Sequence, residues 1–125
     1  MTGVSEGRSS SDADRLLIAR ISGIAQRHAR WRELTDAEIA VAVAELRAVA
    51  GGRPDLLAEE AGILIGFYQD DDLQGPKARN AARLCREAGA DEALIPQWIP
   101  EGKRRAELRR KPPFSDPARR TPRPQ

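Results

Sequence analysis

Residues 34–54, LTDAEIAVAVAELRAVAGGRP, contain one helix together with the signals that begin and end it. Thr35, followed three residues later by Glu38, forms a capping box. Apolar residues then recur at helical spacing until Gly51-Gly52, where glycine is typical of a helix end. The β-branched residues of IAVAV also suit a strand, but the capping box, the alanine content and the terminal glycines favour a helix. Pro54 is well placed as the first residue of the next helix.

The same kinds of signal predict helices on both sides of this stretch. Before it, apolar residues spaced by three or four predict an amphipathic helix from Asp12, with a stripe that Leu16 widens. The stripe consists of Leu17, Ile21, Ile24, His28 and Trp31. After it, the helix from Pro54 is the most apolar and is expected to be central. Its Gly62 and Gly66 lower helix propensity, so we expect close backbone contact with another helix there.

A further helix is predicted after Pro76, with alanines facing inward and Gly89 at its end. A short helical stretch follows Asp91, interrupted by Pro96 and Pro100. A separate, highly charged helix is predicted from Glu101 to Lys111.

These elements together predict an all-α fold, a small bundle of four or five short helices. The chain has 125 residues, which suits a single domain, and we expect that domain to span residues 12–111. Residues 1–11 and the basic, Pro/Arg-rich tail of residues 112–125 are predicted to be disordered.

The cysteine content and the lack of long apolar runs indicate the cellular compartment in which the protein is expected. The one cysteine, Cys85, rules out an internal disulfide and suits a reducing compartment. No secretory signal and no apolar run of membrane-spanning length is present, so we expect a cytoplasmic protein without a membrane partner.

Charge is small overall but unevenly distributed. The net charge is +2, yet residues 33–72 carry ten acidic and two basic side chains, and residues 101–125 carry nine basic and three acidic ones. Arginine outnumbers lysine eighteen to three, which codon bias in a GC-rich genome explains as well as selection for phosphate contacts does.

Residues able to carry out catalysis are few. His28 and Cys85 lie on apolar helix faces, and we interpret them as a packed histidine and a buried thiol rather than a base and a nucleophile. Asp70, Asp71 and Asp72 lack the further oxygen ligands of a calcium loop, which favours a solvated connection. The sequence therefore predicts a protein that is not an enzyme and has no metal or cofactor.

Two sets of basic residues are candidate nucleic-acid contacts. One set shares a face of the helix after Pro76, and it consists of Arg79, Arg83 and Arg86. The other lies in the C-terminal charged helix, and it consists of Lys103, Arg104, Arg105, Arg109, Arg110 and Lys111. Both could meet phosphates, and the alternative for each is an ordinary solvated helix face.

Residues 81–106 resemble the helix-turn-helix segment of excisionase and MerR-type proteins. Ala82-Arg83-Leu84 match the first helix, Gly89 the turn and Ile95 an apolar position. Trp98-Ile99 with Gly102-Lys103 match the end of the second helix. The segment departs from that pattern in its longer spacing before Gly89, in the acidic Asp91 and Glu92, in Pro96 and in the missing wing. The resemblance implies DNA binding.

Two functions follow from these patterns. The first is an accessory protein that contacts nucleic acid through the basic C-terminal helix and arm. The second is a protein-interaction or self-associating module that pairs the acidic surface of residues 33–72 with the basic arm of residues 101–125.

Overall fold

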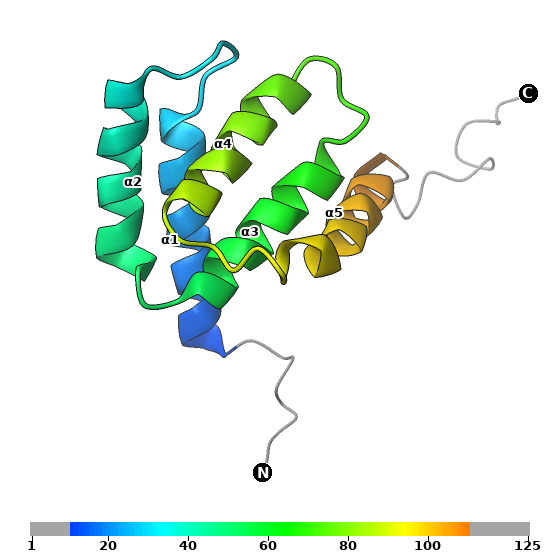
Figure 1. Ribbon diagram of the computed structural model, residues 1–125. Helices are drawn as coiled ribbons and strands as arrows, with labels where there is room; N and C mark the ends of the chain where they lie inside the picture. The colour runs from blue at the N-terminus through cyan, green and yellow to red at the C-terminus, as the bar shows by residue number, and fades with distance from the viewer. Residues whose placement is uncertain (1–10, 111–125) are drawn as a thin grey trace, which may run out of the picture.

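The computed structural model describes residues 11–110, which form five α-helices (Figure 1). They are α1 (Asp12–His28), α2 (Asp36–Ala50), α3 (Pro54–Phe67), α4 (Gly75–Glu87) and α5 (Ile95–Arg110). No strand occurs in this range, so the predicted all-α bundle is confirmed. None of these helices is long and apolar enough to cross a membrane.

The ends of the chain predicted to be disordered lie outside the described residues, with the exception of Ser11. Its side-chain Oγ accepts a hydrogen bond from the backbone N–H of Asp14 at 3.0 Å. Ser11 is therefore the N-cap of α1 and belongs to the folded part of the chain.

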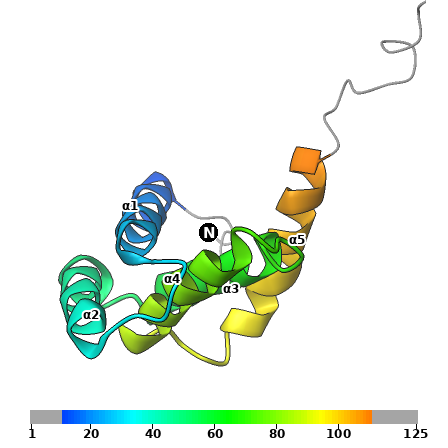
Figure 2. The same cartoon turned by 90° about the horizontal axis from the view of Figure 1, so that it is seen from above.

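The helix α3 is central, as its apolar sequence predicts. It contacts each of the other four helices, and its Leu57, Ala58 and Ala61 are fully buried. Seen from above, α1 and α2 lie on one side of α3 and α5 lies on the other (Figure 2). Among the five helices, α5 packs against α3 alone.

The local start and stop signals act as the sequence predicts. The Thr35 hydroxyl accepts the N–H of Glu38 at 3.1 Å, and the Glu38 carboxylate accepts the N–H of Thr35 at 2.9 Å, which completes the capping box. Pro54 is the first residue of α3, where its missing N–H leaves no partner unsatisfied. Gly89, with a φ of 116°, follows the end of α4 in a conformation that favours glycine.

Glycines bring the backbones of α3 and α5 into direct contact. A Cβ atom at Gly62 would collide with the carbonyl oxygen of Ile95, and one at Gly66 with that of Ile99. From the other side, a Cβ atom at Gly102 would meet the backbone of α3. This close approach confirms the reason expected for two glycines inside an apolar helix.

The C-terminal region is one continuous helix, whereas the sequence predicted a short stretch and a separate charged helix. Pro96 is the second residue of α5, where no intrahelical N–H bond is needed. Pro100 lies inside α5 and removes one backbone hydrogen bond, while both rings are exposed to solvent. Asp91 belongs to the preceding turn, where its carboxylate accepts the N–H of Ala93 at 3.0 Å.

The apolar stripe of the first helix is shorter than predicted. Ala29 has an extended backbone, with a φ of −71° and a ψ of 151°, so α1 ends at His28. Trp31 therefore lies in the connection to α2 and is 58% exposed. Leu16, predicted to widen the stripe, is also exposed.

Two of the acidic residues predicted to form a surface in residues 33–72 are buried instead. Glu59 and Glu60 of α3 are only 8% and 6% exposed. They follow Leu57 and Ala58 on a helix that is covered on several sides, so hydrophobic packing of α3 takes both carboxyl groups out of water. The acidic surface of residues 33–72 is correspondingly smaller than the sequence predicts.

Candidate nucleic-acid interface

The helix α5 has a narrow buried edge and a wide cationic face. Gly102 and Ala106, four residues apart, are buried on the side of α3. The remaining circumference is mostly charged toward its C-terminal end, where it also exposes the apolar Leu108. Its basic residues in the described range are all exposed, and we refer to them as the α5 basic surface: Lys103, Arg104, Arg105, Arg109 and Arg110.

Glu101 positions two of these guanidinium groups. Its Oε2 lies 2.7 Å from Arg104 Nη2 and 2.7 Å from Arg105 Nε. The hydrogen bonds from Arg104, the larger cause, and from Arg105 lower the pKa of Glu101 to about 2. Within residues 11–110, no carboxylate pairs with Lys103 or Arg110, so these two cations remain available to a polyanion.

An aromatic ring lies at the edge of the α5 basic surface. The Arg109 guanidinium is 5.7 Å from the centroid of the Phe67 ring, within the range of a cation–π contact. Beside it, a shallow pocket between the end of α3 and α5 is lined by Phe67, Lys103 and Arg110, together with the acidic Asp70 and Glu107. The carboxylates of Asp70 and Glu107 reduce the positive charge of this pocket.

The second predicted basic set, on α4, is exposed but largely paired. Arg83 Nε lies 3.7 Å from Glu87 Oε2, and Arg86 Nε lies 3.1 Å from Glu92 Oε2. Arg79 is exposed and forms no ion pair with the described residues. Because α4 and α5 make no contact with each other, the structure does not join this set to the α5 basic surface.

The residues that carry the helix-turn-helix resemblance mainly hold helices on α3. Leu84 and Ile95 are buried, Trp98 and Ile99 are half-buried, and Gly102 lies against the α3 backbone. Arg83, Gly89 and Lys103 are the exposed members of the motif. The DNA binding that the resemblance implies stays a prediction. Lys111, the last predicted contact, lies outside the described residues.

His28 has a partner that the sequence did not indicate. Its Nε2 lies 2.6 Å from Glu45 Oε1, and the other oxygen of Glu45 accepts from Arg27. The hydrogen bonds from His28, the larger cause, and from Arg27 lower the pKa of Glu45. The three side chains tie the end of α1 to α2, which accounts for a histidine at the edge of the core.

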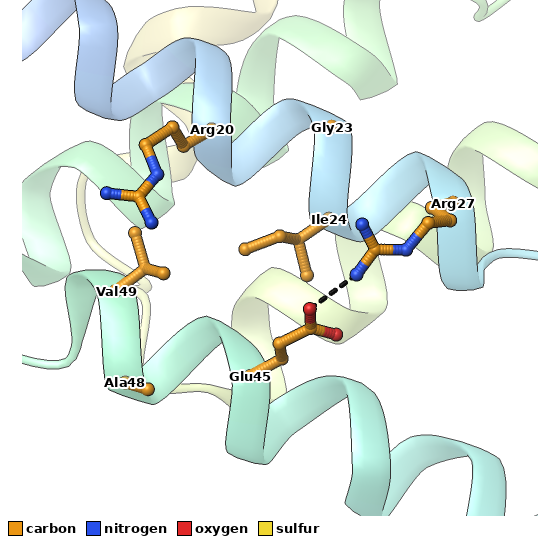
Figure 3. Close-up of a pocket in the computed structure, with 7 residues that line it drawn as sticks. All are labelled: Arg20, Gly23, Ile24, Arg27, Glu45, Ala48 and Val49. Carbon is orange, nitrogen blue, oxygen red and sulfur yellow. Dashed lines mark hydrogen bonds and ion pairs between the residues drawn. The ribbon is translucent and has the colours of Figure 1, made fainter.

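An open groove between α1 and α2 lies beside this cluster (Figure 3). Ile24 and Val49 form its apolar part, Arg20 lies at one end, and the Arg27–Glu45 pair crosses the other. Gly23 contributes no side chain, which keeps the α1 side open. The groove holds no arrangement of nucleophile and base that would indicate catalysis.

The remaining reactive groups are structural in the described part of the chain. Cys85 is fully buried, and burial raises the pKa of its thiol, so the thiolate is disfavoured. Asp71 accepts the N–H groups of Leu73 and Gln74 at 3.0 and 2.8 Å and so closes the turn before α4. Residues 11–110 contain no group of three or more His, Cys, Asp or Glu placed to hold a metal ion.

The environments of Trp31 and Glu60 could not be predicted from the sequence either, because they depend on residues distant in the chain. The Trp31 Nε1–H donates to the carbonyl of Leu73 at 2.8 Å, across 42 positions of sequence. The pKa of Glu60 is raised by burial and lowered in part by the Ser22 hydroxyl of α1, 38 positions earlier in the chain. No local pattern in either segment signals these contacts.

No protein-family model, curated protein or solved structure matches this chain.

Proposed function

We propose that this protein is a non-enzymatic helical accessory protein that contacts nucleic acid through the α5 basic surface and the arm of residues 101–125. The chain has one cysteine and so no internal disulfide, which suits a reducing cytoplasm as its location. A protein that contacts phosphates through such a surface would bind nucleic acids with little dependence on their base sequence.

The observation that carries the proposal is the exposure of all five cations on a helix with one narrow buried edge. Since α5 packs only against α3, a nucleic acid can approach its cationic face without disturbing the rest of the bundle. Neutralising phosphates releases counterions, which is the main source of sequence-independent affinity.

The alternative, a protein-interaction or self-associating module, has less support. Half of the ten acidic residues in 33–72 are already engaged or buried within the chain. Glu38 pairs with Arg32, Glu45 with Arg27 and Asp55 with Arg53, while Glu59 and Glu60 are buried. Fewer carboxylates are thus free to attract a basic arm.

A charge-matched comparison tests the proposal. The double variant Lys103→Gln/Arg110→Gln removes two unpaired cations of α5, and Arg15→Gln/Arg20→Gln removes two exposed cations of α1. We expect the α5 variant to bind a fluorescent oligonucleotide at least about tenfold more weakly at about 100 mM salt, with a salt slope shallower by about 2. The α1 variant should stay within about threefold of wild type, since its cations lie outside the interface.

Equal losses in the two variants would show that only net charge matters and would contradict a specific role for α5. Circular dichroism of both variants checks that the helices are intact.

Replacing Glu101 should strengthen binding. In Glu101→Gln the carboxylate that holds Arg104 and Arg105 is gone, so both guanidinium groups can turn toward phosphates. We expect roughly three- to tenfold tighter binding and a steeper salt slope by about 1, measured in the same anisotropy assay. The variant Asp12→Asn, an exposed acid of α1, is the control with the same change in charge. Weaker binding by Glu101→Gln would argue that its pairing with the arginines is needed for contact.

A further inference from the structure

Trp31 is an exposed aromatic ring that the structure nevertheless holds in place. Its Nε1–H is satisfied by the carbonyl of Leu73 at 2.8 Å. The connection around it is fixed on α4, because the Asn80 side chain donates to the carbonyls of Arg30 and Arg32 at 2.6 and 2.8 Å. The ring is still 58% exposed, so a large aromatic surface is displayed in one orientation.

One cation lies over this ring, and three arginines adjoin the ring or its anchoring residues in the chain. Lys77 Nζ lies 5.3 Å from the ring centroid and is held there by a 2.8 Å hydrogen bond to the carbonyl of Gln26. The ring is flanked in the chain by Arg30 and Arg32, and the exposed Arg79 adjoins Asn80. We refer to these residues as the Trp31 patch: Arg30, Trp31, Arg32, Lys77 and Arg79.

The charge of the Trp31 patch suits an anionic ligand. Of its four cations, Arg32 is the one that pairs with a carboxylate of the described residues, that of Glu38 at 2.7 Å. Glu33 and Asp72 adjoin Arg32 and Leu73 in the chain, and the Asp71 carboxylate accepts the N–H of Leu73 at 3.0 Å, whereas Arg30, Lys77 and Arg79 form no ion pair with a carboxylate of the described residues. A partner binding by apolar contact would find the exposed Leu73 close by, but three cations without a carboxylate partner favour phosphate.

An exposed aromatic ring beside basic side chains is the arrangement with which proteins bind single strands, since bases stack on the ring while cations contact the backbone. In a duplex the base faces are stacked on one another and are not accessible to the ring. We infer that Trp31 stacks on an unpaired base of a single-stranded nucleic acid, with the cations of the Trp31 patch on its phosphates. This inference rests on the proposed function, because it adds base stacking to a protein that binds phosphates through α5.

Tryptophan fluorescence tests the inference directly. In a Trp98→Phe variant, Trp31 is the one tryptophan left. Titration with a thymidine oligonucleotide of about 12 residues should quench its emission, and a duplex of the same length should leave the emission nearly unchanged.

Binding measurements on the otherwise unaltered chain give an independent readout. Trp31→Ala should weaken single-strand binding by roughly 5- to 150-fold, and Trp31→Phe, which keeps a ring, should lose much less. Leu73→Ala is the matched control, since Leu73 is an exposed neighbour without a stacking surface and should bind as wild type does.

The possible outcomes separate this inference from the proposed function. Binding that depends on α5 but neither quenches Trp31 nor changes in Trp31→Ala would overturn the inference and leave the proposed function standing. Equal quenching by duplex and single strand would also overturn it. Absence of binding to either form at low salt would remove both.

Discussion

Replacing Gly66 with alanine is expected to lower the free energy of unfolding by at least about 2 kcal/mol. The added Cβ atom would collide with the carbonyl of Ile99, and it would also come within 3.0 Å of the backbone nitrogen of Lys103. Because these are backbone atoms of α5, a change of side-chain rotamer cannot relieve the contact. The whole helix has to move away from α3, which is its only support among the helices.

Gly23→Ala is the matched control for this effect. Gly23 is an exposed glycine inside α1, and a Cβ atom there would meet nothing within 4 Å. Alanine favours the helix, so this variant should gain up to about 1 kcal/mol. Urea unfolding followed by circular dichroism measures both. If Gly66→Ala proved as stable as Gly23→Ala, the close crossing of α3 and α5 would be wrong.

The second large effect concerns Glu60, whose stability contribution should change with pH. Burial, the dominant cause, raises the pKa of Glu60 to about 7, although the Ser22 hydroxyl and the charge of Arg105 act in the opposite direction and Glu59 adds to the rise. In the unfolded chain this carboxyl has its ordinary pKa near 4.5. Between these two values the folded protein binds more protons than the unfolded one, so stability falls as pH rises.

Below about pH 4.5 the carboxyl group of Glu60 is protonated in both the folded and the unfolded state, so its burial lowers the free energy of unfolding least. Above about pH 7 the full cost of a buried charge is present, roughly 3 kcal/mol for a pKa difference of this size. Glu60→Gln has nearly the same shape and cannot ionise, so we expect its free energy of unfolding to exceed that of wild type by roughly 2–3 kcal/mol at pH 8 and to match it near pH 4.5.

Urea unfolding at several pH values between 4.5 and 8 checks this, with Glu33→Gln as the exposed control. A difference between Glu60→Gln and wild type that stayed constant over this range would contradict an ionising, buried Glu60.

Elements with local signals could be predicted from the sequence, and elements that depend on distant contacts could not. The capping box at Thr35, the proline at the start of α3 and the glycine after α4 act within one turn of helix, so their outcome did not depend on the rest of the fold. Pro96 and Pro100 were read as breaks because proline disfavours helix interiors. In the structure the first falls in the opening turn of α5, and the second is tolerated within it.

In the candidate interface, too, the features set by local sequence could be predicted, and those set by distant contacts could not. The exposure of the basic residues of α5 could be predicted, because charged side chains on a helix face water. The ion pairs of Glu101 with Arg104 and Arg105 are also local, at spacings of three and four residues. Trp31 was instead assigned to an apolar stripe, since only the distant residues Leu73 and Asn80 determine how the connection after α1 lies.

Electrostatic contact with nucleic acid through α5 and the arm is tested most directly by the salt dependence of binding of the full chain. We expect about half of the nine basic residues in 101–125 to contact phosphates at the same time. Release of the corresponding counterions gives a slope of log K against log salt of about −4. Affinity for an oligonucleotide should then fall by a few hundredfold between about 50 and 200 mM salt. Absence of nucleic-acid binding by the full chain at about 50 mM salt, or an affinity that does not change with salt, would contradict electrostatic contact through α5 and the arm.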